Sequence, residues 1–417
     1  MSLKERHVDN KQKTVLIIGA GKEAVTGITQ AKEMGYTVYV SDGDLNAPGI
    51  AYADGFIQAS VYDPQETRQA ILGHDCRDKI GGVLAIACDA PVTVSTVAKA
   101  LNLDSHSVET ATVATHKLLM KQAFHKAGIP TPWFRAVESI GHLRHLIQKE
   151  QKVLVLKPVD SRGSRGVLRL LPDISHEEIT WAYELSVSYS GAKQLIVEHW
   201  MDGPQLSTES VIWDEESQLV AVADRNYDQL ENHAPFIMEN GGNTPSVHSP
   251  QIDLDLNEII AAASKAIGLH RGTVKGDIVI GPEGPVVIEI AARLSGGYFC
   301  THTIPKVYGV NLIKAALEIC TGQKPDFSAL KPQIRCVQGN RHLFLKEGVI
   351  KSVQVSSELV DHSNVAIFKL NIKSGDKIEK VTDHTRRHGV IMTFCETREK
   401  AVELAERCID SVDIVYG

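Results

Sequence analysis

Short apolar runs alternate with amphipathic stretches over the first hundred residues. The run Thr14–Ile18 is almost wholly apolar, which is typical of a strand buried on both faces of a sheet. Gly19 and Gly21 interrupt this run, and the spacing of apolar residues then predicts a helix over Ala24–Met34. Strand and helix patterns recur at Tyr36–Ser41, Gly82–Ala87 and Val92–Ala100. This alternation predicts a parallel sheet covered by helices.

The middle of the chain has a different pattern. Helical spacing predicts helices over Lys117–Ala127, Leu254–Ile267 and Val310–Cys320. Short apolar runs predict strands of an antiparallel sheet at Val153–Leu156, Leu195–Glu198, Leu206–Trp213 and Leu219–Ala223. The runs Asp277–Ile280 and Pro285–Ile290 flank the turn Gly281–Gly284, which predicts a hairpin.

The tail predicts a small α+β unit. Four short alternating stretches precede a helical pattern over Arg398–Ser411, namely Val349–Val355, Val365–Leu370, Lys377–Val381 and Gly389–Phe394. We therefore expect α/β and α+β architecture in three domains, over residues 1–111, 112–325 and 326–417.

Composition excludes several classes of protein. The 417 residues are 43 % apolar and 23 % charged, so bulk disorder is excluded. The net charge of −7 argues against a nucleic-acid binder, although a nucleotide needs only a local basic pocket. No apolar run approaches the length of a membrane span, and Met1–Lys13 lacks the apolar core of a secretory signal. The seven scattered cysteines include no C-x-x-C pair, so we expect a reducing cytoplasm and neither zinc nor disulfides.

A glycine turn follows the first predicted strand. Gly19, Gly21 and Gly27, with Asp42 after the next strand, are similar to a dinucleotide-binding fingerprint, but Ala24 takes the place of its third glycine. A tight strand-to-helix corner needs glycine equally, so we expect no NAD here. Asp42 remains a candidate for contact with a small substrate, because such sheets bind ligands at the carboxyl ends of their strands.

Lysines and a glycine-rich loop predict a phosphate site. Lys117 opens a helix and Lys157 ends a strand, and the loop Ser161–Gly166 follows. Small residues let backbone N–H groups close around phosphate oxygens, while lysines supply positive charge. The loop has no apolar residue to anchor it, so we expect it to be a mobile lid. The chain has no G-x-x-x-x-G-K-[ST] motif, which excludes a P-loop NTPase.

Two acids in the predicted hairpin indicate a metal site. Asp277 and Glu289 are 12 residues apart and can face each other across the two strands. Two close carboxylates repel unless a hard cation lies between them, and Mg²⁺ favours one or two carboxylates together with phosphate oxygens. Arg293 follows Glu289 by four residues and could pair with a phosphoryl group or a substrate carboxylate.

In this order, these groups resemble the ATP-grasp superfamily, whose members activate a carboxylate with ATP. The motifs that carry the resemblance are Lys157-Pro158, Gly203-Pro204 and Val287–Gly297. The last motif and Arg386–Gly389 are most similar to L-amino-acid ligases and related carboxylate–amine ligases. The resemblance implies a Rossmann-like pre-ATP-grasp domain, an ATP-grasp fold with a mobile lid at about residues 151–200, and a small C-terminal α+β domain.

The resemblance also implies roles for single residues. It implies ATP contacts from phosphate lysines, lid loop, adenine hinge and ribose contact, which are Lys117, Lys157, Ser161, Gly163, Ser164, Gly166, Glu198, His199, Met201 and Gln205. It implies Asp277 and Glu289 as ligands of Mg²⁺ or Mn²⁺, and Arg293 and Lys157 as catalytic groups. Substrate contacts are expected from Glu209, Ser295, Gly296 and Gly297.

Three positions depart from the family pattern. Gln205 stands where members usually have a ribose-binding Glu, although an amide can still hydrogen-bond a hydroxyl. Ala291 stands where many members have a metal-binding Asn, and Asp277 replaces the commoner Glu.

The implied function is an ATP-dependent ligase. It activates a carboxylate as an acyl phosphate and joins it to an amine, releasing ADP and phosphate, with an amino-acid or dipeptide ligase as the expected type. One alternative is a purine-pathway ATP-grasp enzyme, which would need a sugar-phosphate site. Another is a non-catalytic nucleotide sensor, in which Gln205 and Ala291 record lost catalysis. We expect ATP and small substrates as partners, with neither nucleic acid nor membrane, and a homodimer as the candidate assembly.

Overall fold

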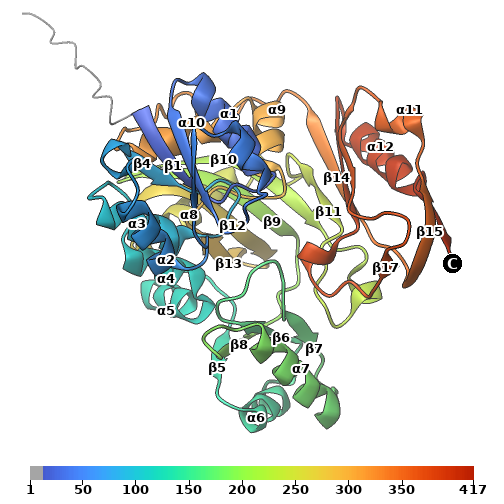
Figure 1. Ribbon diagram of the computed structural model, residues 1–417. Coiled ribbons are helices and arrows are strands. Elements are labelled where there is room, and N and C mark those ends of the chain that lie inside the picture. Colours follow the sequence, from blue (N-terminus) through green and yellow to red (C-terminus); the bar gives the residue numbers. More distant parts are fainter. Residues whose placement is uncertain (1–12) are drawn as a thin grey trace, which may run out of the picture.

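The computed structural model describes residues 13–417 (Figure 1). The expectation of no secretory signal concerns residues that lie, except for Lys13, outside this range. Within residues 13–417, no helix is both long and apolar enough to cross a membrane.

The N-terminal unit is the predicted parallel sheet. Its strands lie in the order β3-β2-β1-β4, and their bounds are β1 Thr14–Ile18, β2 Thr37–Asp42, β3 Gly55–Gln58 and β4 Gly82–Leu84. Helix α1 (Ala24–Glu33) connects β1 to β2, α2 (Pro64–Leu72) connects β3 to β4, and α3 (Pro91–Ala100) follows β4. Alternate residues of β1 enter two different cores, because Val15 packs with Ile28 of α1 while Leu16 packs with Val97 of α3. Burial on both faces explains the continuous apolar run in β1.

An eight-stranded sheet forms the body of the molecule, with strand order β13-β12-β9-β10-β11-β14-β18-β16. Its first five strands are β9 (Gln205–Trp213), β10 (Glu216–Asn226), β11 (Gly241–Thr244), β12 (Arg271–Gly281) and β13 (Gly284–Ala291). Strand β12 begins six residues before the predicted start, because Arg271–Gly276 pairs with β9 although it is not strongly apolar. The same part of the chain also contains helices α4 (Val108–Thr115), α5 (Lys117–Ala127), α8 (Asp253–Ala266), α9 (Ile304–Tyr308) and α10 (Leu312–Cys320).

The tail extends the same large sheet. Strands β14 (Val337–Leu343), β16 (Val365–Leu370) and β18 (Gly389–Cys395) continue it from β11, and α12 (Arg398–Asp410) packs on them. A separate small sheet holds β15 (Gly348–Gln354), β17 (Lys377–Ile378) and β19 (Asp413–Tyr416), and the short helix α11 (Ser357–Val360) contacts β16. Hydrogen bonds between β11 and β14 therefore cross the predicted boundary at 325, and the boundary at 111 falls inside α4.

A smaller lobe projects from the body, at the bottom of Figure 1. It contains the sheet β5-β8-β6-β7, with β5 Phe134–Val137, β6 Leu154–Pro158, β7 Leu168–Leu170 and β8 Leu195–His199. Helices α6 (Ile140–Glu150) and α7 (His176–Ser188) complete the lobe, which has its own apolar core. Its first strand begins before residue 151, where we expected the lid to start.

Candidate active site

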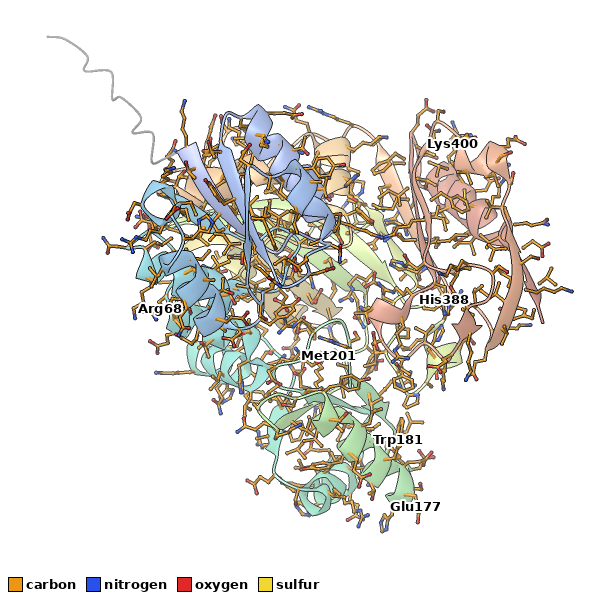
Figure 2. All side chains as sticks on the ribbon, viewed as in Figure 1. Arg68, Glu177, Trp181, Met201, His388 and Lys400 are labelled. Carbon is orange, nitrogen blue, oxygen red and sulfur yellow. The ribbon has the colours of Figure 1, made fainter. Side chains whose placement is uncertain are left out.

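A cavity of about 200 Å³ lies between the lobe and the large sheet. Twelve of the expected site residues line it, which are Lys117, Lys157, Ser161, Gly163, Ser164, Glu198, His199, Met201, Gln205, Asp277, Glu289 and Arg293. In Figure 2, Met201 lies where the lobe that carries Trp181 meets the body. Residues distant in sequence are thus brought together around one cavity. Gly166 is not among the lining residues, and its carbonyl accepts a hydrogen bond from Ser186 Oγ at 2.8 Å.

The acid pair faces across the hairpin. Asp277 of β12 and Glu289 of β13 are direct register partners, and both side chains line the cavity. Ser207 Oγ, from the neighbouring strand β9, donates to Asp277 Oδ1 at 3.3 Å. The two carboxylates meet as the sequence predicted, but a β-bulge at Ile288 is what places Glu289, rather than Ile288, opposite Asp277.

Three cations surround these acids. Arg225 Nη1 lies 3.0 Å from Asp277 Oδ1, Lys275 also pairs with Asp277, and Lys117 Nζ lies 3.6 Å from Glu289 Oε2. Burial opposes ionisation of Asp277, but Lys275 and Arg225 outweigh it and hold the pKa of Asp277 well below its usual range. Burial also opposes ionisation of Glu289, and Lys117 is the main group that lowers the pKa of Glu289. Both acids are therefore carboxylates at neutral pH.

The charge balance decides how a metal could bind. Two carboxylates face three cations, so the site as folded is not attractive to a free divalent ion. Residues 13–417 contain no group of three or more His, Cys, Asp or Glu side chains placed to hold a metal. A magnesium ion fits here only if phosphate oxygens complete its coordination. The donor set thus suits a metal–nucleotide complex.

Glu198 joins two lysines inside the molecule. Its Oε2 lies 2.9 Å from Lys157 Nζ and 3.4 Å from Lys121 Nζ, and all three side chains are buried. Burial lowers the pKa of Lys121 to about 8, against the attraction of Glu198. Burial also opposes ionisation of Glu198, but Lys121 and Lys157 lower its pKa. The carboxylate of Glu198 therefore holds Lys157 in position. Lys121 was not predicted from the sequence to belong to the site.

A buried network links the acid pair to the tail. Arg225 pairs with Glu239 Oε2 at 2.7 Å as well as with Asp277, and Arg387 donates to the carbonyl of Glu239 at 2.7 Å. Arg387 belongs to the motif Arg386–Gly389. Burial opposes ionisation of Glu239, but Arg225 outweighs it and holds the pKa of Glu239 well below its usual range. The tail thereby supports the arginine that contacts Asp277.

Polar contacts hold the lid loop over the cavity. Lys117 Nζ donates to the carbonyl of Ser161 at 2.8 Å. Arg162 donates to the carbonyl of Asp89 at 3.1 Å and lies 4.0 Å from the ring centroid of Tyr62. On the other side, the backbone N–H of His384 donates to the carbonyl of Gly163 at 3.0 Å. The loop expected to lack anchors thus has partners in the N-terminal sheet unit and in the tail.

The contacts that hold this loop are weak, so we expect the loop to become more rigid when nucleotide binds. The contacts of Arg162 are partly exposed, and such contacts contribute little to stability. A triphosphate would add charge-assisted hydrogen bonds to the loop. We expect amide exchange over residues 161–166 to slow with Mg-ATP more than exchange in β1, and Arg162→Ala to reduce that slowing. Equal exchange with and without nucleotide would identify the loop as a rigid turn.

The residues expected to contact the substrate lie outside the cavity. Glu209 is fully buried, and its Oε1 accepts a hydrogen bond from the backbone N–H of Ser295 at 3.2 Å. Gly297 and Tyr298 donate their N–H groups to Glu23, at 3.1 and 2.8 Å. None of Glu209, Ser295, Gly296 and Gly297 lines the cavity that holds the acid pair. Strand alternation placed Glu209 on one face of β9 but could not show which loop covers that face.

Glu209 should make stability depend on pH. Burial raises its pKa to about 7, so the folded protein binds a proton that the unfolded chain releases above its ordinary pKa near 4.5. This contribution is complete below pH 4.5 and is lost as the pH rises through 7, by up to about 3 kcal/mol. We expect Glu209→Gln to lose less stability than the parent between pH 5 and pH 8 in urea denaturation. An identical loss in both proteins would show that Glu209 is not protonated when folded.

The carboxylate of Asp42 accepts hydrogen bonds from the backbone around the glycine turn. Asp42 accepts hydrogen bonds from the backbone N–H groups of Ala20 at 2.7 Å and Asp44 at 3.0 Å. A Cβ at Gly27 would overlap Ile86, so this glycine serves packing of α1. Because Asp42 is occupied by backbone donors, we expect no NAD(H) binding in the micromolar range. A fluorescence titration with NADH tests this expectation, and saturable micromolar binding would contradict it.

Two family models match the chain. Residues 114–297 match the ATP-grasp domain, and residues 341–417 match the L-amino acid ligase C-terminal domain 2. These matches confirm the resemblance to ATP-grasp ligases that the motifs indicated.

Individual proteins resemble this chain in sequence and in fold. An uncharacterized protein of Sinorhizobium fredii is 23 % identical over 80 % of this chain and 68 % of its own length. Alanine–anticapsin ligase of Bacillus subtilis is 25 % identical over 64 % of this chain, which spans 61 % of that ligase. The structure of an L-amino acid ligase from Bacillus licheniformis superposes with a TM-score of 0.80 at 19 % identity, covering 97 % of this chain and 99 % of that one. The predicted mixed α/β fold with an ATP-grasp core is confirmed.

Proposed function

The chain is an ATP-grasp ligase homologue that carries an L-amino acid ligase C-terminal domain, and we propose that it joins an amino acid, or another small carboxylic acid, to an amine at the expense of ATP. One observation carries the proposal. Asp277 and Glu289 oppose each other in the same cavity as Lys157 and Arg293. That cavity combines acids for a metal with cations for phosphate, which is what phosphoryl transfer from ATP needs.

The reaction has two steps. A carboxylate oxygen of the substrate attacks the γ-phosphorus of ATP, the bond to the β,γ-bridging oxygen breaks, and ADP leaves as an acyl phosphate forms. The amine nitrogen then attacks the acyl carbon, the carbon–oxygen bond to phosphate breaks, and the nitrogen gives up a proton. Lys157 and Arg293 offset the negative charge that develops. The closed loop over residues 161–166 excludes water that would hydrolyse the acyl phosphate.

Magnesium would be held by Asp277 and Glu289 together with the triphosphate. When bound, it would neutralise phosphate charge and orient the γ-phosphoryl group. Because Arg225, Lys275 and Lys117 already balance the two acids, the protein should bind the metal only together with nucleotide.

A second cavity of about 340 Å³ lies beside the glycine turn, and Lys22, Glu23, Asp42 and Lys369 are among its lining residues. Backbone N–H groups already occupy the carboxylates of Glu23 and Asp42, so this cavity does not select the substrate. The match of residues 341–417 to the L-amino acid ligase C-terminal domain 2 supports the amino-acid ligase over the purine-pathway type.

An ADP-release screen over pairs of amino acids and small carboxylic acids tests the proposal, with amide products identified by mass spectrometry. We expect ADP, phosphate and amide in equal amounts from at least one pair, and no amide from either substrate alone. ATP binding without ADP release for any pair would favour a nucleotide sensor. Turnover only with a phosphoribosylated amine would favour the purine-pathway type.

The three-domain division stays a prediction, because residue 111 lies inside α4 and β14 pairs with β11 across residue 325. We also propose movement of the lid and a homodimer as the working assembly. Light scattering of the full chain measures that assembly. A monomer at the concentrations used for the assay would contradict the dimer.

A further inference from the structure

A mainly apolar cavity near the site lies outside the ATP cavity. It has a volume of about 420 Å³ and lies between β4, the start of α3 and α10, with Leu84, Val94, Ile319 and Cys320 in its wall. β4 is an edge strand of its sheet, and the side of β4 that pairs with no other strand within residues 13–417 faces this cavity. The volume is within the range of small-molecule sites.

The two arginines around this cavity are already paired, and the one carboxylate in its lining, Asp104, is exposed to solvent. Arg271, at the rim, makes two contacts with Asp214 at 2.8 and 2.9 Å. Arg293 is the one lining residue shared with the ATP cavity, and its Nε lies 3.3 Å from Asp89 Oδ1. A charged ligand would therefore lose its hydration without gaining a free buried partner.

One buried polar atom in the wall of the cavity has no hydrogen-bond partner within the described part of the chain. His106 lines the cavity, and its buried Nε2 has no hydrogen-bond partner among residues 13–417. Burial lowers the pKa of His106 to about 4, against a hydrogen bond to the Pro91 backbone, so the imidazole is neutral at pH 7 with one ring nitrogen donating and the other free to accept. Buried polar atoms without a partner are rare, and a bound molecule is one reason for them.

We propose that this cavity is a second ligand site, for a small uncharged and largely apolar molecule with one N–H or O–H group that donates to His106. Arg293 forms part of both walls, so occupancy of this site should alter turnover in the ATP cavity. The proposed ligase activity assigns nothing to this cavity, and the binding part of the proposal does not depend on that activity.

Indole is a suitable probe because it has one N–H group, and 1-methylindole is the matched control without a donor. Binding to the full chain is measured by calorimetry in the absence of ATP. We expect saturable binding of indole, at least tenfold tighter than that of 1-methylindole. His106→Leu should remove this preference, because it removes the acceptor.

A variant that fills the cavity with a larger side chain tests where the probe binds. Ile319→Trp should abolish binding of both probes, whereas Leu254→Trp, which adds the same ring at a position 78 % exposed, should bind like the parent. The thermal unfolding temperature of each variant verifies folding. No saturable binding by the parent, equal binding by Ile319→Trp, or a preference for indole that survives His106→Leu would each overturn the site.

The coupling has its own readout. Indole at saturation should change the rate of ADP release at least twofold in the parent and leave that of Ile319→Trp unchanged. An unchanged rate in a parent saturated with indole would overturn the link through Arg293. A chain that binds indole but never releases ADP would instead contradict the proposed ligase.

Discussion

Glu289→Ala is expected to reduce ATP turnover on the order of a hundredfold or more while the protein stays folded. Glu289 supplies one of the two opposed carboxylates, and its loss leaves Asp277 alone to hold a metal–nucleotide complex. It also removes the partner of Lys117, which would leave that lysine free to pair elsewhere. ADP release measured at saturating ATP, together with the thermal unfolding temperature, tests both parts.

Two further variants make this test specific. Glu289→Gln keeps the shape and removes the charge, so its rate should fall as far as that of the alanine variant. Glu283→Ala removes an exposed acid from the tip of the same hairpin and should turn over like the parent. If Glu289→Ala retained even a tenth of the parent rate, the assignment of the metal ligands would be wrong.

The parts of the site that follow from the sequence are those set by local geometry. A short turn between two strands brings Asp277 and Glu289 to neighbouring positions, and a β-bulge at Ile288 then shifts the register by one residue so that the two acids face each other. The 12-residue spacing predicted their proximity but not the bulge. Lys157 and the loop after it are likewise adjacent in sequence. These inferences needed no knowledge of how distant elements pack.

Residues supplied by distant elements could not be found in this way. Lys121 is in the middle of α5, where a lysine is typical of a solvated face, and only packing against Glu198 and Val287 shows it to be buried. Arg225 and Glu239 come together from β10 and the segment before β11. Lys275 precedes Asp277 by two residues, so a shared strand face was the one local signal for it.

The fold shows the same division. The buried strand β1 was predictable because burial on both faces leaves a continuous apolar run. The addition of β14 to the large sheet was not predictable, since Val337–Leu343 includes Asn, Arg and His and a strand edge does not name its partner. The tail was consequently predicted as a unit of its own.

Glu198→Ala is expected to lower the free energy of unfolding by about 3–5 kcal/mol, because it leaves two buried lysines without their shared carboxylate. Lys121→Met should cost less, since it leaves Glu198 paired with Lys157. If the loss in Glu198→Ala arises from unpaired charge, adding Lys121→Met to it should restore part of the stability. Urea denaturation of the three variants at pH 7 measures these differences.

The pH dependence of Glu198→Ala separates unpaired charge from lost packing. In the parent, the folded protein releases the Lys121 proton near pH 8, while the unfolded chain holds it to about pH 10.4. The cost of burying this charge is complete below pH 8 and falls as the pH rises toward 10.4, so stability gains with pH. Without Glu198 the folded pKa should be lower still, because the main attraction that opposes burial is gone. Glu198→Ala should therefore recover part of its lost stability between pH 7 and pH 9, whereas Glu198→Ala combined with Lys121→Met should not. Equal losses at both pH values would mean that Glu198 acts through packing, and that its carboxylate does not hold the lysines in place.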